Sequence, residues 1–593
     1  MKIFLISLIF LTYSFVDATT YTVAETGGDF TSISEALTAA QAGDTIMVRA
    51  KSVPYNEVVE FRSSGNETDG YITLMAYPGE HPVIDGSGLE NNTDWPLGLV
   101  KIINKNYIRV EGFEIRNLIA SNSGQFPGGI WIRGTSHHIE IKNNIVHHIE
   151  QNGNNAGAHG IAVYGTSGSS SIHDLLIDGN EVYSCKLGWS ESLVLNGNVE
   201  NFVVSNNVIH DNNNIAYDFI GFEGECPVPE LDQARNGIVA DNIAYNIDSR
   251  GNPAYGDEAS ADGFYVDGGK DILFERNTAY NCNIGFEVAS EHGGKITSGI
   301  VVRNNLIREN IVLGLSIGGY DSDRGEARDC KIINNTFYKN NSENFNWGAE
   351  ILLQYYCGNN VFKNNIVFSK SNTPLVENTT RTGENNVFDF NLYFTEGNAV
   401  WRWDNDAYSD FASFQTGSGE DAEGLFADPK LADPSNDNPA LQSGSPAIDA
   451  GMNMSADIVG EFDFFGSERI QNGTIDVGAA EFDFANSIED GEGSVLPEDF
   501  RMLPAYPNPF GKSIETGNVA TNIRFIINSG KEKTLKLIIY DTTGRIIENI
   551  SLKSIRSGMN IYRWNAANLS SGNYFAVLTD GRYSEAVKIL LLK

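Results

Sequence analysis

Val301-Val302-Arg303-Asn304-Asn305 is one copy of a short pattern that returns through the middle of the chain. Apolar residues lead into paired asparagines, as at the end of a β-strand with one buried face. Related copies lie at residues 139–144, 176–180, 203–207, 238–242, 273–277, 332–335 and 362–365. Their last asparagines are 36, 27, 35, 35, 28, 30 and 30 residues apart along the chain. One such unit per coil predicts a parallel β-helix with loops of varying size.

Asparagine suits the turn of each coil because its side chain tolerates left-handed backbone and can bond neighbouring peptide groups. Stacked from coil to coil, these asparagines are expected to bond one another in a ladder. The 60 glycines and 41% hydrophobic residues fit this loop-rich, all-β interpretation.

The ends of the chain predict export and a division into parts. Residues 1–18 have the charged start, apolar run and small-residue site of a signal peptide, and no later run is long enough to span a membrane. A short helix near Phe30–Leu37 is expected to cap a β-helix domain over 19–384. Residues 385–483 are interpreted as irregular final coils forming a C-terminal cap, and 484–499 as a linker.

The last part, 500–593, carries more specific motifs: 506–510, 521–525, 539–545, 558–564 and 571–575. Together they resemble the type A sorting domain of the type IX (Por) secretion system of Bacteroidetes. The resemblance implies a small β-sandwich, passage through the outer membrane with the type IX machinery as partner, and release or surface attachment. An ordinary β-sandwich binding module is the alternative.

Charge and cysteine content exclude several classes of partner. There are 41 basic and 77 acidic residues, a net charge of −36, which argues against nucleic acid and anionic membranes. The five cysteines are scattered and odd in number, so we expect small buried side chains rather than a disulfide framework. No CxxC or clustered Cys/His spacing indicates zinc.

A second strand of the form apolar-x-apolar-x precedes most of the asparagine turns. Its copies lie at 130–133, 161–164, 193–196, 220–223, 264–267, 286–289, 315–318 and 351–354. With the apolar residues inward, the outward positions carry Trp131, Arg133, Tyr164, Asn196, Glu223, Tyr265, Asp267, Glu287 and Gln354. Aromatic and amide groups mixed with acids favour a ligand groove over a plain solvated face.

Three of these outward residues are acids on neighbouring coils, and they are the predicted catalytic centre. In this alignment Glu223 and Asp267 share a column about 5 Å apart, and Glu287 lies about 8 Å from Asp267. Carboxyl pairs at such distances serve retaining and inverting glycosidases, and close acids raise one another's pKa. Tyr265, Trp131 and Tyr164 would offer flat surfaces to sugar rings. Arg133, Asn196, Glu291, His292 and Gln354 complete the predicted substrate contacts.

Glu287 follows Asp267 by twenty residues, in a Phe-Glu-Val context that ends at His292-Gly293. The two residues resemble the Asp and Glu of one family of β-helix β-xylosidases. Glu223 stands in the place of a third acid. More broadly, residues 20–480 resemble the right-handed β-helix polysaccharide lyases, hydrolases and epimerases. The resemblance implies a right-handed coil and an enzyme that acts on polysaccharide. No cofactor is expected to be required, and Ca²⁺ enters only with the lyase alternative.

Two other functions stay open. A uronate lyase would need Ca²⁺ and a basic residue. Its oxygen ligands could come from Asp257, Glu258, Asp262, Asp321 and Asp323, and its base from Lys270, Arg303 or Arg324. Asp262 itself is expected in a loop. A non-catalytic glycan-binding adhesin is the other alternative, although insertions at 224–236, 247–261 and 319–329 cluster around the acidic strands, as loops do at an enzyme site.

Overall fold

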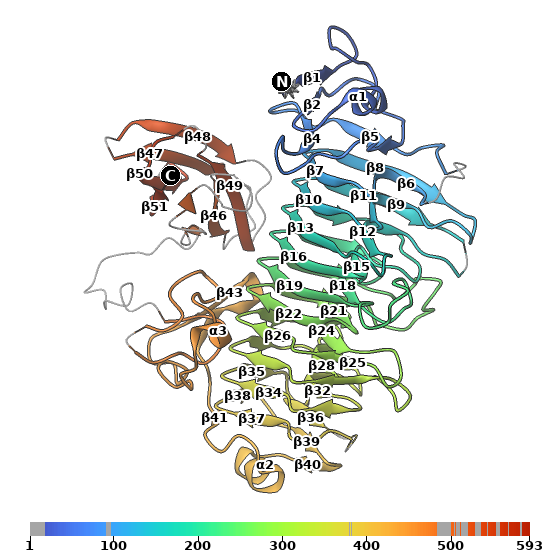
Figure 1. The fold of residues 1–593 in the computed structure, drawn as a ribbon. Coiled ribbons are helices and arrows are strands. Elements are labelled where there is room, and N and C mark those ends of the chain that lie inside the picture. Colours follow the sequence, from blue (N-terminus) through green and yellow to red (C-terminus); the bar gives the residue numbers. More distant parts are fainter. Residues whose placement is uncertain are drawn as a thin grey trace, which may run out of the picture.

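The computed structural model describes residues 18–482 except 91–95, 154, 379, 381 and 472. It also describes 500–592 except 503–504, 506–509, 512–519, 528–534, 543, 553–557, 567–568 and 582–583. The predicted signal peptide, the linker and the 506–509 motif therefore lie outside the described residues, apart from Ala18. Figure 1 shows the chain winding into a long stack of coils, with a small β domain formed by its C-terminal strands.

Three parallel sheets run along the stack, and from β4 (Ile72–Ala76) to β39 (Trp401–Trp403) each coil contributes one strand to each sheet. The main path of sheet A consists of β1 (Thr20–Val23), β2 (Thr45–Val48), β4 (Ile72–Ala76), β7 (Asn106–Glu111), β10 (His137–Lys142), β13 (Ile172–Asp178), β16 (Val199–Ser205), β19 (Ala234–Ala240), β22 (Lys270–Glu275), β26 (Val301–Arg303), β30 (Lys331–Ile333), β34 (Val361–Lys363) and β37 (Val387–Asp389). A side branch holds β25 (Ile296–Ser298), β29 (Glu326–Arg328) and β33 (Cys357–Gly358).

From β4 on, sheet B follows sheet A in every coil. It contains β5 (Val83–Asp85), β8 (Glu114–Ala120), β11 (Ile145–Gln151), β14 (Glu181–Tyr183), β17 (Val208–Asn212), β20 (Ile243–Ile247), β23 (Thr278–Cys282), β27 (Leu306–Arg308), β31 (Thr336–Tyr338), β35 (Ile366–Ser369), β38 (Leu392–Thr395) and β41 (Leu425–Phe426).

Sheet C carries the strands with the predicted catalytic residues. It contains β3 (Val59–Glu60), β6 (Gly98–Ile103), β9 (Gly128–Arg133), β12 (His159–Gly165), β15 (Leu193–Gly197), β18 (Tyr217–Ile220), β21 (Asp262–Asp267), β24 (Ile284–Ala289), β28 (Leu313–Ile317), β32 (Ala349–Leu353), β36 (Val376–Asn378) and β39 (Trp401–Trp403), which pairs with the antiparallel β40 (Asp406–Tyr408). The predicted parallel β-helix is confirmed, and one continuous apolar core from Val23 to Phe414 fills the coils.

The expected asparagine ladder is present where sheet A turns into sheet B. In each step the side-chain N–H of one asparagine donates to the side-chain oxygen of the next, as from Asn144 to Asn180 at 3.0 Å and from Asn207 to Asn242 at 3.0 Å. The ladder continues through Asn277, Asn305, Asn335 and Asn365 to Asn391. These side chains are fully or almost fully buried, so every coil adds satisfied polar groups to the interior of the stack.

Helices cover both ends of the stack. Near the N-terminus α1 (Ile33–Ala39) begins at Ser32, whose hydroxyl oxygen accepts the backbone N–H of Glu35. At the other end α2 (Phe411–Ser418) packs Phe414 flat against Trp401, with ring centroids 5.5 Å apart. Their apolar side chains seal the open ends of the core.

Two details of the C-terminal coils differ from expectation. Parallel pairing continues past residue 384 to β41, so the coils at 385–426 are regular rather than irregular. The rest of the segment, with β42 (Leu431–Asp433), η1 (Pro434–Asn436), β43 (Asn438–Leu441) and α3 (Ala456–Val459), does not form an end cap. It runs back along the outside of the coils (Figure 1). There it covers outward apolar residues such as Leu306, Ile333 and Ile366.

The C-terminal domain has its own apolar core and two sheets. One holds β44 (Phe500–Met502), β46 (Ala520–Ile527) and β49 (Gly558–Asn565), and the other holds β45 (Phe510–Gly511), β51 (Ser584–Leu592), β50 (Gly572–Thr579), β47 (Leu535–Asp541) and β48 (Ile546–Leu552). All five cysteines are free and buried, as predicted. No helix in the described part of the chain combines the length and apolar character needed to cross a bilayer.

Candidate active site

The outer face of sheet C is hollowed into a pocket of about 1150 Å³. Loops that lead from sheet B into sheet C form one wall, with Trp189, Tyr255 and Trp347. Loops that leave sheet C toward sheet A form the other, with Tyr320 and Tyr355. Ten carboxyl side chains line the space: Glu191, Asp218, Glu223, Asp257, Glu258, Asp262, Asp267, Glu287, Glu291 and Glu377. Among the described residues that line it, none is lysine, arginine or histidine.

The register of sheet C decides which acids meet on the floor of the pocket. Asp218 pairs with Tyr265, and Tyr265 pairs with Glu287 on the next coil. Asp267 lies two residues beyond Tyr265 on the same strand. Strand rise and coil spacing put the backbones of Asp267 and Glu287 about 8 Å apart, as the sequence alignment predicted.

The predicted column of Glu223 and Asp267 is wrong. Tyr217, not Ile220, pairs with Phe264, so β18 ends before Glu223 is reached. Tyr217 is held there because its ring stacks on Phe264 at 4.7 Å and its hydroxyl donates to the carbonyl of Asn207. Phe222, expected inward, is half-buried with a left-handed φ of 70° where the chain leaves the strand.

Ile220 consequently faces outward, where it joins an apolar cluster with Trp131, Ala162 and Val194. Glu223 still reaches the pocket from the loop, and its carboxylate accepts the side-chain N–H of Asn196 at 2.6 Å. It is exposed at the rim, whereas Asp267 is only 4% exposed on the floor.

Asp262 and Glu287 form a hydrogen-bonded pair of carboxyl groups on the floor. Asp262, expected in a loop, is instead the first residue of β21 and is 2% exposed. Burial and the neighbouring Glu291 raise the pKa of Glu287 to about 8. Burial and Glu287 raise the pKa of Asp262. Since two carboxyl groups bond directly when one of them holds a proton, the pair stores a proton at neutral pH.

Asp267 has a different environment, although burial and Glu291 raise its pKa too. Its Oδ1 accepts the backbone N–H of Glu291 at 2.7 Å, a contact that favours the ionised form. The carboxylate of Glu291 in turn accepts the hydroxyl of Tyr265 at 3.0 Å. These contacts fix Asp267 as an acceptor that points into the pocket.

Sequence reasoning missed two further buried acids, Asp218 and Glu191. Burial and the charge of Glu191 raise the pKa of Asp218, and burial and Glu223 raise that of Glu191. The alternation of Tyr217 and Phe219 about Asp218 would have revealed Asp218 in the correct register. Glu191 lies in a loop before β15, where no periodic pattern marks it.

The remaining predicted contacts divide into two groups. Tyr265, Glu291 and Gln354 line the pocket, while Asn196 reaches it through Glu223. Four others lie outside its lining: Trp131, Arg133, Tyr164 and His292. Trp131 is corrected as a sugar platform because it is only 2% exposed and its indole N–H donates to the carbonyl of Leu97.

The predicted Ca²⁺ ligands and bases of a lyase also divide into residues that line the pocket and residues that do not. Asp257, Glu258 and Asp262 line the pocket, whereas Asp321 and Asp323 do not. None of the three candidate bases lines it. Arg303 pairs with Glu275 on sheet A, and Arg324 donates to the backbone carbonyl of Glu291.

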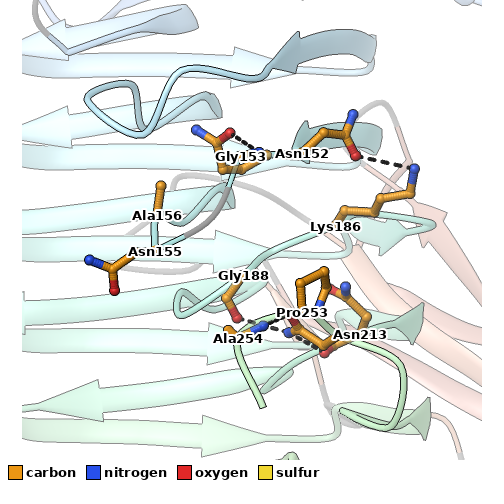
Figure 2. A pocket seen from close by; sticks show the side chains of 11 residues that line it. Asn152, Gly153, Asn155, Ala156, Lys186, Gly188, Asn213, Pro253 and Ala254 are labelled. Carbon is orange, nitrogen blue, oxygen red and sulfur yellow. Dashed lines mark hydrogen bonds between the residues drawn. The ribbon is translucent and has the colours of Figure 1, made fainter. Parts of the chain in front are cut away.

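A second pocket, of about 70 Å³, lies where sheet B turns into sheet C (Figure 2). Its polar groups are already used within the protein. Lys186 donates to Asn152 at 3.4 Å, and the side chain of Asn252 donates to the carbonyl of Gly188 at 2.9 Å. The acid-lined pocket is therefore the candidate active site.

Comparison with known families agrees with the fold. The family model "Pel9A-like, right handed beta helix region" matches residues 15–186, and "Right handed beta helix region" matches 128–337. "Secretion system C-terminal sorting domain" matches 504–592. The C-terminal domain thus directs the protein by type IX secretion to the cell surface or the extracellular space.

Solved structures with a similar fold include XylC in complex with xylose, with a TM-score of 0.43 and 15% identity over 78% of this chain and 99% of that one. Another is the PL6 family polysaccharide lyase Pedsa3628 from Pseudopedobacter saltans, with a TM-score of 0.37 and 14% identity over 74% and 98% of the two chains. These likenesses concern the fold.

A curated relative is much nearer in sequence. The protein described as "Uncharacterized protein YwoF", from Bacillus subtilis (strain 168), is 38% identical over 421 residues, which are 70% of this chain and 88% of that protein. The chain therefore belongs to the same family as YwoF, its coils match right-handed β-helix family models, and residues 504–592 form a type IX secretion sorting domain.

Proposed function

We infer that this protein is a secreted glycoside hydrolase that cleaves an uncharged polysaccharide or oligosaccharide in the acid-lined pocket of sheet C. The observation that carries the proposal is the hydrogen-bonded pair of Asp262 and Glu287 beside Asp267. Glycoside hydrolysis needs one carboxyl group that holds a proton and a second that acts as an anion.

Glu287 is the general acid in this proposal. With a pKa of about 8 it carries its proton at neutral pH and can donate it to the glycosidic oxygen of the leaving sugar. Asp262 shares that proton before reaction and holds the carboxyl group of Glu287 in position.

Asp267 supplies the anion, either as nucleophile or as base toward water. The backbone N–H of Glu291 stabilises its ionised form, a contact that Asp218 and Asp262 lack at their unpaired Oδ1 atoms. Glu223, at the rim, adds negative charge that raises the pKa of Asp267. The walls of Trp189, Tyr255 and Trp347 offer apolar faces to sugar rings.

The charge of the pocket favours hydrolysis over uronate elimination. A lyase must neutralise the substrate carboxylate, and the pocket lining contains ten acids and, among the described residues, no basic side chain. The described lining therefore has no cationic side chain to neutralise an anionic sugar, which would need a cation to accompany it.

The test incubates the purified protein with uncharged glycans and with polyuronates, with and without EDTA. Release of reducing ends from an uncharged glycan, unaffected by EDTA, is the expected result. Absorbance of unsaturated uronate that disappears with EDTA would instead identify a Ca²⁺-dependent lyase, and binding without any product would identify an adhesin.

Asp267→Asn tests the anionic role directly. It removes the charge and keeps the shape, so turnover should fall at least about 100-fold. Asp323→Asn is the matched control, because Asp323 lies in an exposed loop outside the pocket lining. Full activity of the Asp267→Asn variant would contradict the proposed role of Asp267 as the catalytic anion.

A further inference from the structure

Two histidines on one coil face a histidine and an aspartate on the next, on the outer side of sheet A. His137 pairs with His173 in the register of β10 and β13, and His138 and Asp174 follow them. His138 and Asp174 both have a left-handed backbone, with φ of 54° and 52°, so the same local bulge is repeated on the two coils. The four side chains therefore stack as two pairs.

The ligand atoms of three of these residues lie within 4.8 Å of one another: His138, His173 and Asp174. Oδ2 of Asp174 is 2.7 Å from Nδ1 of His173 and 3.5 Å from Nδ1 of His138. Ligand atoms around a tetrahedral Zn²⁺, at bonds of about 2.0–2.1 Å, are roughly 3.3 Å apart. Small side-chain rotations bring the three atoms to that spacing.

Aromatic neighbours hold the rings of His138 and His173 in place. The ring of His173 stacks on His137 at 4.9 Å, and that of His138 stacks on Tyr107 at 4.3 Å. His137 places its Nδ1 3.0 Å from Nδ1 of His138.

Solvent can reach the site. The side chains of His138 and His173 are 33% and 30% exposed, and that of Asp174 is 48% exposed. A metal held by these three residues keeps a fourth position open for water. Two imidazoles with one carboxylate suit Zn²⁺ and its first-row neighbours better than Ca²⁺ or Mg²⁺, which prefer oxygen ligands.

We propose that His138, His173 and Asp174 form a binding site for a divalent transition-metal ion, with Zn²⁺ as the reference ion. The ion joins neighbouring coils on sheet A, and it takes no part in the glycan chemistry of sheet C. Because the ligands meet in the folded state, binding stabilises the folded β-helix.

The test titrates ZnCl₂ into the full chain, freed of metal with EDTA and dialysed, in a calorimeter. One ion per chain is expected, with a rise of a few degrees in the midpoint of thermal unfolding. His173→Ala and His138→Ala should each weaken Zn²⁺ binding at least tenfold. Both positions are on the surface, and unchanged circular dichroism of the metal-free variants checks that they fold.

His148→Ala is the matched control. His148 has the same left-handed backbone, with φ of 53°, and its Nδ1 is 2.6 Å from Nδ1 of His147. The following coil, however, places Tyr183 opposite His147 instead of a metal ligand. This variant should bind Zn²⁺ as the wild type does.

Three results would overturn the proposal. The first is the absence of stoichiometric Zn²⁺ binding by the wild type. The second is a wild-type affinity in both the His138→Ala and the His173→Ala variants. The third is an anomalous X-ray signal of zinc at any other group of side chains.

Discussion

Glu287 shows how the position of one side chain sets its chemistry. It is 7% exposed, it bonds another carboxyl group, and its pKa is about 8. We expect Glu287→Gln to lower kcat at least about 100-fold, because the amide cannot protonate the leaving group. Initial rates on the glycan identified in the substrate screen measure the effect.

The control for Glu287 is Glu350, another buried glutamate whose pKa burial raises to about 8. Its side chain accepts the N–H of Asn340 at 2.6 Å, and it lies outside the pocket lining. Glu350→Gln should keep the wild-type rate. Equal losses in the two variants would mean that general destabilisation, not catalysis, explains the result.

The pH dependence of activity follows from the same group. Glu287 donates its proton, so kcat should decline as the pH rises through about 8. A pH–rate profile between pH 5 and 10 measures this limb. A rate that stays level to pH 10 would contradict the assignment of Glu287 as the acid.

The stability of the protein should depend on pH through this residue as well. The pKa of Glu287 is raised from 4.5 to about 8 on folding, so its stabilising contribution is complete below pH 4.5 and is lost as the pH rises through about 8. Between pH 5 and 9, Glu287→Gln should therefore gain stability relative to the wild type. We expect the difference in unfolding free energy between the variant and the wild type to change by more than about 1.4 kcal/mol, the free energy of one pKa unit. Urea unfolding at pH 5 and at pH 9 measures it.

At the scale of elements, the asparagine ladder ties each coil to the next. Asn242 accepts the backbone and side-chain N–H groups of Asn207 and donates to the carbonyl of Val204. Asn242→Ala leaves these buried groups without partners and should cost roughly 2–5 kcal/mol of unfolding free energy. Denaturant unfolding measures the loss.

Asn246→Gly is the comparison for the ladder. Asn246 also donates to a side-chain oxygen, that of Asp211, but the contact is exposed and its φ is 53°. Glycine tolerates this backbone, so the change should cost less than about 1 kcal/mol. A similar loss of unfolding free energy in both variants would show that burial does not determine how much the asparagine ladder stabilises the fold.

Strand β18 shows why the register of an element could not be predicted from its own residues. Tyr217 and Phe219 alternate as Ile220 and Phe222 do, so two alignments three residues apart fit the pattern. They differ in which face is inside. An outward apolar cluster with Trp131 covers Ile220, so its apolar character gave no sign that it faces outward.

At the scale of the whole molecule, the β-helix and the sorting domain have separate apolar cores. A chain that ends at residue 483 should therefore fold and keep the proposed glycoside hydrolase activity. In the native host, with the predicted signal peptide intact, the shortened chain should stay in the periplasm while the full chain reaches the surface or the medium. Cell fractionation and immunoblotting measure this, and export of the shortened chain would contradict the role of the domain.

The sequence by itself determined the coil, the ladder and the secretion tail, because each rests on local patterns repeated along the chain. It also placed Asp267 and Glu287 on neighbouring coils with the right offset. Only the tertiary structure decided that Asp218, Glu191 and Asp262 join them. Asp218 comes from another register, Glu191 comes from a loop, and Asp262 comes from a strand that begins earlier than predicted. The histidine site on sheet A arises in the same way: stacking brings residues 35 positions apart, His138 and His173, into contact, and loops of variable length hide that pairing from the sequence.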